Sequence, residues 1–342
     1  MKIAINYQVQ EGPWGGGNRF VANLVAALTA RGDTVTTSLS DDDIDVVLMI
    51  DPRWRNPATT FGPGRILRYL ARQNPRAIAI HRINECDERK GTSGLNQRLG
   101  RANYVADHTV FVADWLRRDL AVWHDKNDQN SSVILNGADP EVFHAHGHLE
   151  WDRTTPLKLV THHWGGNWMK GFDIYQQIDD MLDQPQWRDR IEFTYIGNLP
   201  PGFSFKNAHY ISPLDGEALA EKLRAQHVYV TASRFEPGSN HQNEGALCGL
   251  PVLYVNSGAL PEYCDGFGIQ FEPAAFETAL EKMITDYDAY QAHNASYPHV
   301  ASRTTDRYIA LFDDLVARRD TITANRRLFR NPLLFARNQL PV

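Results

Sequence analysis

Short apolar runs rich in β-branched residues alternate along the chain with stretches whose apolar positions recur every three or four residues. The short runs predict buried strands, and the longer spacing predicts amphipathic helices. In the first half, this pattern predicts strands at residues 3–6, 46–50, 77–80, 109–112 and 133–135. Such an alternation favours α/β units with parallel sheets.

The alternation restarts after Pro156, and it predicts strands at residues 157–161, 191–196, 228–231 and 252–255. A last amphipathic helix over about 304–318 carries Tyr308, Leu311, Phe312 and Leu315 at helical spacing. The segment 145–156 is polar and has no period, which indicates a hinge. With 342 residues, we expect two domains, 1–150 and 157–300, followed by a final segment over 301–342.

The first predicted strand runs into a glycine-rich segment, residues 11–17 (EGPWGGG), before a helix with Phe20, Val21, Leu24 and Leu28 on one face. Glycines let a ligand approach the backbone, and a helix N-terminus offers free N–H groups. We expect a phosphate or a sugar hydroxyl there. The alternative is a turn that only needs positive φ. The spacing matches neither a P-loop nor GxGxxG, so neither an ATPase nor a dehydrogenase is supported.

Eight of the eleven residues in HRINECDERKG (81–91) are polar or charged, although they follow a predicted buried strand. His81 is therefore expected at the carboxyl end of that strand, where α/β folds place their chemistry. Taken alone, a histidine such as His81 is more often a hydrogen-bonded structural residue than a catalytic one. A metal site formed with Glu85 is not supported, because no third ligand has a recognisable spacing.

In the second half, THHWGGNWMKG (161–171) occupies the matching place. Lys170 lies at a predicted helix start, where the helix dipole opposes a cation. A bound anion would remove the conflict, whereas the alternative is an exposed lysine at a frayed helix end. His162, His163, Trp164 and Trp168 are suited to stacking on a ligand, but tryptophan is also ordinary core material.

In the segment SRFEPGSNHQNEGALCGLPVLY (233–254), seven residues separate Glu236 from Glu244, and they include the loop 237–240. A short helix between Glu244 and Cys248 then precedes an apolar strand. Amides at a helix start beside two carboxylates suit a diphosphate and sugar hydroxyls. The alternative is a solvated pair of glutamates, which the Gly-Leu-Pro strand entry makes improbable.

At this point the sequence resembles the retaining glycosyltransferases of the GT-B fold, in the family 4-like group (group 1). Four motifs agree in order, and they are GGG (15–17), VILNGADPEVF (133–143), Lys170-Gly171 and the Glu-x7-Glu block with CGLPV (248–252). The resemblance implies two Rossmann-like domains with parallel sheets facing a central cleft. It also implies a C-terminal helix that crosses back to the first domain.

The resemblance further implies where a nucleotide-activated sugar binds. Lys170 would neutralise the donor diphosphate, Glu244 would bind the ribose, and Glu236 would contact the transferred sugar near its anomeric carbon. His81 would approach the same sugar from the first domain. The remaining implied donor contacts are Gly16, Gly17, Gly238, Ser239 and Asn240. No metal and no cofactor are implied beyond the co-substrate, which is expected to be linked to UDP or GDP.

The acceptor, a glycan, glycolipid or protein, would meet the first domain, and its candidate contacts are Arg82, Asn84, Glu85 and Asp87. The chain departs from the family where many relatives have an arginine before the lysine. Here HHWGGNWM (162–169) contains none. Either His163 takes its place, or the diphosphate is held less tightly. A partner subunit that has lost catalysis and a sugar-nucleotide epimerase remain alternative functions.

The net charge of −6 argues against a protein that binds nucleic acid through overall basicity, but the charge is unevenly spread. Residues 53–101 hold eleven basic and three acidic residues, with Arg65, Arg68 and Arg72 at helical spacing. Residues 318–342 hold six arginines and one acid, interleaved with leucine and phenylalanine. Our hypothesis is that the first stretch meets a phosphorylated or lipid-linked acceptor or an anionic membrane. The alternative is a solvated helix face. The tail suits an interfacial anchor, a subunit contact or a chain packed along the first domain.

The sequence has three scattered cysteines, and near its start it has no apolar run of membrane-spanning length and no signal core. We therefore expect a cytoplasmic enzyme, in contact with the inner face of the cytoplasmic membrane if the basic stretches bind lipid. A role in bacterial surface polysaccharide, lipopolysaccharide or glycoconjugate synthesis fits this expectation.

Overall fold

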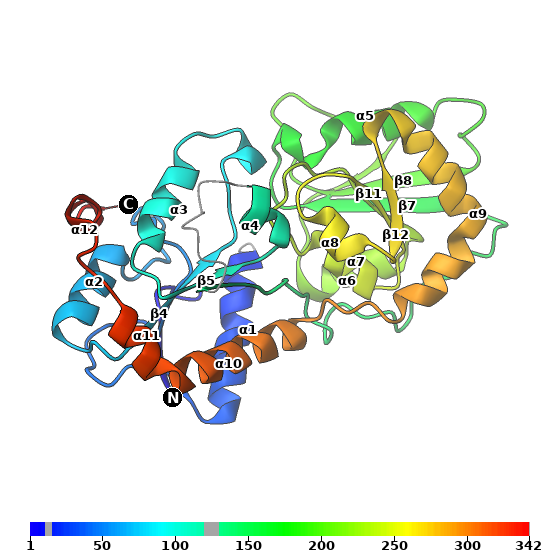
Figure 1. Ribbon diagram of the computed structural model, residues 1–342. Helices are drawn as coiled ribbons and strands as arrows, with labels where there is room; N and C mark the ends of the chain where they lie inside the picture. The colour runs from blue at the N-terminus through cyan, green and yellow to red at the C-terminus, as the bar shows by residue number, and fades with distance from the viewer. Residues whose placement is uncertain (11–15, 120–129, 342) are drawn as a thin grey trace. The chain divides into compact units, whose positions relative to one another are not determined.

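The computed structural model describes residues 1–10, 16–119 and 130–341, and it divides into two compact units (Figure 1). Unit 1 comprises Met1–Leu135 and Ser302–Val342, and unit 2 comprises Asn136–Ala301. Residues 11–15, the first part of the predicted glycine-rich loop, lie outside the described residues. Gly16 and Gly17 open the first helix.

The chain enters unit 2 earlier than the polar segment 145–156 predicts. Ala138 pairs with Val300, and the Leu149 N–H donates to the carbonyl of Arg224 at 2.8 Å. Residues 136–150 are thus held to unit 2 by backbone hydrogen bonds as well as by packing. Backbone hydrogen bonds do not require apolar side chains at regular spacing. The sequence pattern therefore does not show that this segment belongs to unit 2.

In the described part of unit 1, six parallel strands form one sheet in the order β2-β1-β3-β4-β5-β6. Every residue of β3 and β4 is buried, as expected for a sheet covered on both faces. The strands are β1 (Lys2–Ile5), β2 (Thr34–Thr36), β3 (Val46–Met49), β4 (Ile78–Ile83), β5 (His108–Phe111) and β6 (Ser131–Val133).

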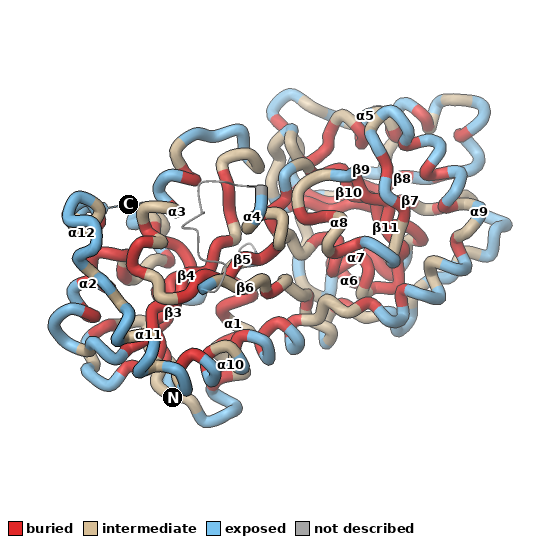
Figure 2. Tube along the Cα trace, in the orientation of Figure 1, coloured by how far each residue is buried: buried red, intermediate tan, exposed pale blue. Residues whose placement is uncertain are grey.

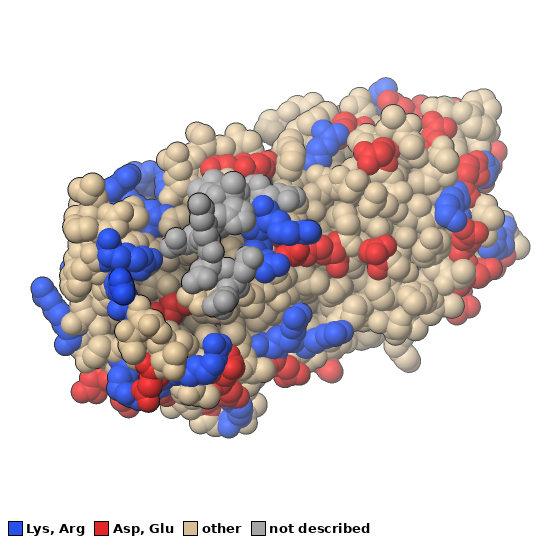
Figure 3. Space-filling view, viewed as in Figure 1, with Lys and Arg blue, Asp and Glu red and all other residues tan. Residues whose placement is uncertain are grey.

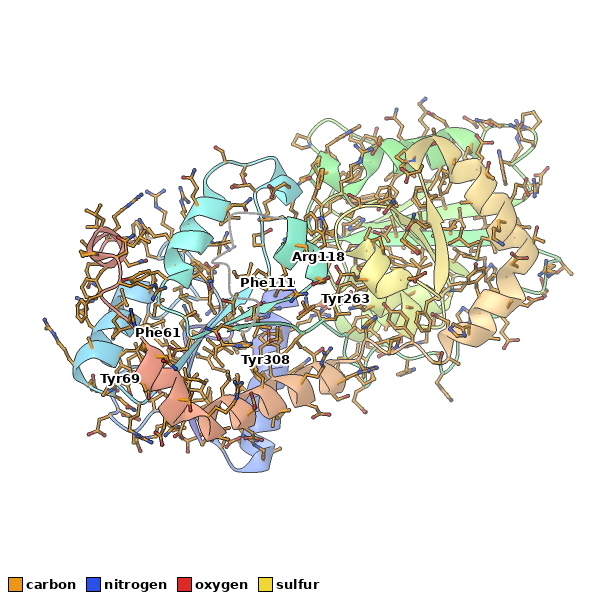
Figure 4. The ribbon with its side chains drawn as sticks, viewed as in Figure 1. Phe61, Tyr69, Phe111, Arg118, Tyr263 and Tyr308 are labelled. Carbon is orange, nitrogen blue, oxygen red and sulfur yellow. The ribbon has the colours of Figure 1, made fainter. Side chains whose placement is uncertain are left out.

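Helices cover this sheet and include the end of the chain. They are α1 (Gly16–Arg31), α2 (Pro63–Arg72), η1 (Glu88–Lys90), α3 (Leu95–Asn103), α4 (Asp114–Asp119), α10 (Ala301–Ala317), α11 (Arg319–Asn325) and α12 (Pro332–Asn338). The apolar face predicted for α10 is confirmed, because Tyr308, Phe312 and Leu315 join the core formed by α1 and the sheet (Figures 2 and 4). The ring of Tyr308 lies 4.9 Å from that of Phe20.

In unit 2, six parallel strands follow the order β12-β11-β10-β7-β8-β9. This is the strand order of the Rossmann fold, with its reversal between β7 and β10. The strands are β7 (Leu157–His163), β8 (Ile191–Gly197), β9 (His209–Ile211), β10 (Val228–Thr231), β11 (Val252–Val255) and β12 (Gly268–Phe271).

The helices of unit 2 are η4 (Trp168–Lys170), α5 (Phe172–Met181), α6 (Gly216–Arg224), α7 (His241–Leu247), α8 (Leu260–Cys264), η5 (Pro273–Ala275) and α9 (Phe276–Asn294). The prediction of two Rossmann-like domains with parallel sheets is confirmed. The helix predicted over about 304–318 is α10, and it belongs to unit 1 together with α11 and α12, as the predicted return of the chain requires.

Candidate functional site

The strongest candidate site lies in unit 2, where β7 and β10 are neighbours and the strand order reverses. Segments that leave the carboxyl ends of two such strands diverge, and α/β proteins bind ligands in the resulting crevice. The segment after β7 carries His163 and Lys170, and the segment after β10 carries Glu236 and leads into α7 with Glu244. The sequence motifs therefore meet at this point of the fold.

Lys170 and Glu236 form a buried ion pair, the Lys170 Nζ donating to Glu236 Oε1. Ser233 Oγ donates to the same carboxylate oxygen at 2.7 Å. Gly171 permits this arrangement, because it adopts a φ of 97° and a Cβ there would lie 2.5 Å from the Cβ of Ala232. Glu236 thus offsets the conflict between Lys170 and the helix dipole, and the binding of an anion by Lys170 stays a prediction.

The backbone around Glu236 is held by the turn that follows β11. The Ala259 N–H donates to the Glu236 carbonyl at 2.8 Å, and the Phe235 N–H donates to Ser257 Oγ at 3.0 Å. Gly258 packs so closely that a Cβ would lie 2.5 Å from the Glu236 nitrogen. Ser257, Gly258 and Ala259 therefore hold the backbone of Glu236 in place.

Glu244, on α7, is bound to a histidine of β7. His162 Nε2 lies 2.7 Å from Glu244 Oε2, and His162 Nδ1 lies 3.1 Å from the hydroxyl of Tyr229 on β10. All three side chains are buried, and burial raises the pKa of the Tyr229 hydroxyl, which therefore stays protonated. A chain of hydrogen bonds from two strands thus orients the Glu244 carboxylate.

His163 is turned into the interior of unit 2. Its Nε2 lies 2.7 Å from the Tyr175 hydroxyl, and its ring centre lies 4.6 Å from that of His241. Tyr175 also accepts a hydrogen bond from the Ala232 N–H at 3.2 Å. The His163 ring is thus bonded to Tyr175. The proposal that His163 takes the place of the missing arginine stays a prediction.

The loop 237–240 is fixed on both sides. Gly238 adopts a φ of 148°, and its carbonyl accepts a hydrogen bond from Asn136 Nδ2 at 2.5 Å. Ser239 and Gln242 bond to each other, Oγ to Oε1 at 2.9 Å and Nε2 to the Ser239 carbonyl at 2.6 Å. This loop leads through Asn240 directly into α7 and Glu244.

In unit 1, His81 lies inside β4 rather than after it, since this strand continues to Ile83. The expectation that residues 81–83 begin a loop is therefore wrong. The polar residues are accommodated because His81 Nδ1 lies 3.0 Å from Asn103 Oδ1. Burial lowers the pKa of His81 to about 4, so its ring is neutral at pH 7. Its buried Nε2 has no hydrogen-bond partner among the described residues.

The four predicted acceptor residues have different surroundings. Arg82 is buried, with its guanidinium carbon 4.1 Å from the centre of the Phe20 ring. Asn84 lies beside Gly17, since a Cβ built on this glycine would be 3.9 Å from Asn84 Nδ2. Of the two, Asn84 is the more accessible to a ligand.

The two predicted acidic contacts have partners within unit 1. Glu85 pairs with Arg89 at 3.0 Å and with Lys90 at 3.3 Å. Asp87 accepts hydrogen bonds from the backbone N–H groups of Leu95 and Asn96 at 3.0 and 2.9 Å. Asp87 therefore organises the start of α3, and its part in acceptor binding remains a prediction.

Sequence reasoning missed three residues of the unit 2 site, namely Tyr229, Tyr175 and Asn136. Tyr229 and Tyr175 lie at apolar positions of a predicted strand and helix, where a tyrosine looks like core material. Asn136 lies in the motif 133–143, but the sequence gives no sign that it bonds to Gly238, 102 residues later. Their roles follow from the register of β7 against β10 and from the course of the loops.

Across residues 1–10, 16–119 and 130–341, no group of three or more histidine, cysteine, aspartate and glutamate side chains is placed to hold a metal ion. None of the helices within these ranges combines the length and apolar character needed to cross a bilayer.

No family model matches the chain, and no curated protein matches it. Solved structures do match its fold. Anabaena HepE in complex with UDP and glucose aligns with a TM-score of 0.62 and 11% identity, over 92% of this chain and 99% of that one. Sucrose-phosphate synthase from Thermosynechococcus elongatus aligns with a TM-score of 0.56 and 16% identity, over 94% and 98%.

The α,α-trehalose 6-phosphate synthase from Burkholderia multivorans aligns with a TM-score of 0.59 and 12% identity, over 88% of this chain and 76% of that one. Identities this low establish architecture and not activity. The chain therefore has the GT-B fold, with two Rossmann-like domains built on parallel sheets.

Proposed function

We propose that the chain is a glycosyltransferase that binds a nucleotide-diphosphate sugar at the unit 2 site and transfers the sugar with retention of configuration. The observation that carries this proposal is that Lys170, Glu236 and Glu244 all lie on the segments that leave the carboxyl ends of β7 and β10. A cation and two carboxylates at the strand reversal of a Rossmann-like domain suit a charged nucleotide and a polyhydroxylated ligand. The GT-B fold supports the same assignment.

Lys170 would bind the donor diphosphate, together with the backbone amides of Gly238, Ser239 and Asn240. In the structure Lys170 is paired with Glu236. A diphosphate carries more negative charge than one carboxylate, so it competes for the ammonium group. Glu236 would then accept hydrogen bonds from the hydroxyls of the transferred sugar. In this proposal the phosphate charge is carried by Lys170 and amides rather than by a metal.

Glu244 would accept hydrogen bonds from the ribose hydroxyls. Its Oε2 accepts a hydrogen bond from His162 at 2.7 Å, which holds the carboxylate in one orientation. Because the carboxylate is oriented before the nucleotide arrives, less conformational entropy is lost on binding. Gly16, Gly17 and His81 of unit 1 are proposed to complete the donor contacts.

The chemical step follows from these roles. The bond between the anomeric carbon and the phosphate oxygen breaks, and the acceptor oxygen bonds to the same face of that carbon. The acceptor proton passes to the leaving phosphate. Lys170 stabilises the negative charge that develops on this phosphate, while positioned hydrogen bonds hold the two reactants.

We propose a UDP- or GDP-linked donor, since Anabaena HepE was crystallised with UDP. The acceptor is proposed to be a glycan, glycolipid or protein in bacterial surface polysaccharide or glycoconjugate synthesis, and the enzyme is proposed to act in the cytoplasm. Arg82, Asn84, Glu85 and Asp87 remain the proposed acceptor contacts, and of these Asn84 and Asp87 are partly exposed.

Calorimetric titration with UDP and with GDP tests the donor site. The protein should bind one of the two, and Glu244→Gln should weaken binding by about tenfold, because a carboxylate accepts stronger hydrogen bonds than an amide. Glu192→Gln, an exposed site on the second strand of unit 2, is the matched control and should bind like the parent protein. Absence of binding by both nucleotides, or equal affinity in the Glu244 variant, would refute the assignment.

A further inference from the structure

The last helix of the chain presents apolar side chains to solvent. Phe329, Leu333 and Leu340 have exposed fractions of 65%, 77% and 63%, which exceed those of all other exposed large hydrophobic residues in the described chain. All three lie within twelve residues of one another. We give the name α12 surface to these three residues together with three exposed arginines, Arg98, Arg327 and Arg337.

The α12 surface is firmly attached to unit 1. The opposite face of α12 packs Leu334 and Phe335 against the core beneath α2 and α3. Asn338 Nδ2 donates to the Arg101 carbonyl at 3.0 Å, and α12 crosses α2 so closely that a Cβ at Gly64 would lie 2.4 Å from the Asn338 carbonyl oxygen. The inner face of α12 is therefore docked on unit 1, while Leu333 on the same helix is exposed (Figures 1 and 2).

Basic side chains surround these apolar ones. Leu333 and Arg337 are four residues apart, so they share the outer face of α12, and Leu340 follows two residues after the helix ends. None of Arg98, Arg327 and Arg337 has a carboxylate partner in the described part of the chain. Arg98 and Arg337 both lie close to Arg101, whose pKa is lowered by burial and by these two neighbouring charges. On the visible face, Lys and Arg gather at the end of unit 1 where α12 and α2 lie (Figure 3).

We propose that the α12 surface docks on a lipid bilayer that carries anionic headgroups. Leu333, Leu340 and Phe329 would enter the boundary between headgroups and acyl chains, and the arginines would meet lipid phosphates. Arg65 and Arg68, exposed on the neighbouring α2, would add attraction at the rim. This inference deepens the proposed function, because it would bring the enzyme to an acceptor held in a membrane.

Two other occupants fit the surface less well. If a second copy of the chain docked face to face, the arginines of one copy would oppose those of the other without any carboxylate between them. A protein partner generally buries a contiguous apolar core from which charges are depleted. Here Arg337 lies between Leu333 and Leu340, an arrangement that suits a headgroup layer better than a dry interface.

Vesicle flotation at low salt tests the proposal. The full-length protein should float with phosphatidylcholine vesicles that contain phosphatidylglycerol, and it should remain unbound with pure phosphatidylcholine. The double variant Leu333→Glu/Leu340→Glu and the single variant Arg337→Glu should each weaken binding by about tenfold or more. Leu149→Glu, an exposed leucine of unit 2, is the matched control and should bind like the parent protein.

Several results would overturn the proposal. They are failure to float with anionic vesicles, equal flotation of all the variants, or a lipid-free dimer in analytical ultracentrifugation that Leu333→Glu/Leu340→Glu dissociates. UDP titration on the same variants separates this proposal from the proposed function, because the α12 variants should bind nucleotide normally. Loss of vesicle binding with intact nucleotide binding would thus concern only the α12 surface.

Discussion

Among single residues, the pair of Glu244 and His162 says most about how the site is built. A buried carboxylate loses its hydration, so it needs a hydrogen-bond donor to offset the cost in free energy. His162 supplies this donor, and the Tyr229 hydroxyl at 3.1 Å fixes the orientation of the imidazole ring. The nucleotide is therefore expected to meet a carboxylate that is already aligned.

This arrangement predicts the effect of removing the imidazole. His162→Leu leaves Glu244 without its buried donor, so UDP affinity should fall by about tenfold, which corresponds to the loss of a charge-assisted hydrogen bond. Binding of 2′,3′-dideoxy-UDP should change much less, since it lacks the hydroxyls that Glu244 contacts. Calorimetric titration of both nucleotides measures the difference. An equal loss for the two nucleotides would show that His162 does not act through Glu244.

Gly165 offers a second test at the scale of the residue. Its Cβ would lie 3.7 Å from the Lys170 Cε, an ordinary contact, so a longer side chain can run alongside Lys170. Gly165→Arg should therefore add a second cation beside the proposed diphosphate site and tighten UDP binding by about tenfold. Titration with UDP checks this gain, and a weaker or unchanged affinity would contradict it.

Gly166 provides the contrasting position beside it. A Cβ there would lie 2.5 Å from the Leu199 carbonyl oxygen, so even Gly166→Ala should lower the melting temperature without any gain in affinity. The two adjacent glycines are thus expected to respond in opposite ways.

Among the elements, the segment after α11 shows how the end of the chain is fastened to unit 1. Arg326 donates to both carboxylate oxygens of Asp107, at 2.8 and 2.6 Å, and to the carbonyls of Pro75 and Ala77. Both charged side chains are almost fully buried. The pair lies where β4 and β5 begin, so it attaches the tail to the amino-end edge of the sheet.

Arg326→Ala should therefore destabilise unit 1 by about 3–5 kcal/mol, because it leaves the Asp107 charge buried without its cation. Urea unfolding measures the change. Arg318→Ala, which removes an exposed pair with Asp314 one turn away on a helix, is the matched control and should cost less than about 1 kcal/mol. Similar losses in the two variants would contradict the anchoring role of Arg326.

Comparison of the predicted and observed elements shows which signals a sequence carries. Buried strands with continuous apolar runs, such as β3 and β11, are predicted within one or two residues. The missed strands β2, β9 and β12 all lie at sheet edges, where exposed residues interrupt the apolar run. β4 extends three residues beyond its prediction because His81 and Arg82 are polar, yet the neighbouring strands and Asn103 accommodate them.

The same limit applies to the site. Lys170, Glu236 and Glu244 stand out in the sequence because polar and glycine-rich motifs interrupt apolar runs. Their partners do not stand out, because the contact between His162 and Tyr229 joins residues 67 positions apart and depends on β7 and β10 being neighbours. Sequence patterns predict elements, whereas such contacts arise only once the sheet order is fixed.

For the whole molecule, buried histidines predict how stability depends on pH. Burial lowers the pKa values of His81 and His108 in unit 1 and of His227 in unit 2 to about 4, from the usual 6.5. Above pH 6.5 these rings are neutral in both the folded and the unfolded chain. Between pH 6.5 and 4 the unfolded chain takes up protons that the folded chain does not, so the free energy of unfolding falls as the pH falls.

The loss should reach about 3 kcal/mol for a fully buried ring such as His81, and less for the more accessible His227. Urea unfolding from pH 7 to 4.5 measures the slope. His108→Gln retains a donor for Ser132, which lies 3.0 Å from His108 Nε2, and should reduce the slope in this window. A free energy of unfolding that stays constant over the same range would contradict the neutral, buried state of these rings.

Release of the nucleoside diphosphate measures whether the unit 2 site activates a nucleotide-diphosphate sugar. The protein is incubated with UDP-, GDP-, ADP- and dTDP-linked sugars, first alone and then with candidate acceptors. We predict release from at least one donor, and Lys170→Ala should lower the rate by about a hundredfold or more while Lys222→Ala, an exposed lysine on α6, leaves it unchanged. If no donor is turned over, or if Lys170→Ala reacts as fast as the parent protein, the account is wrong.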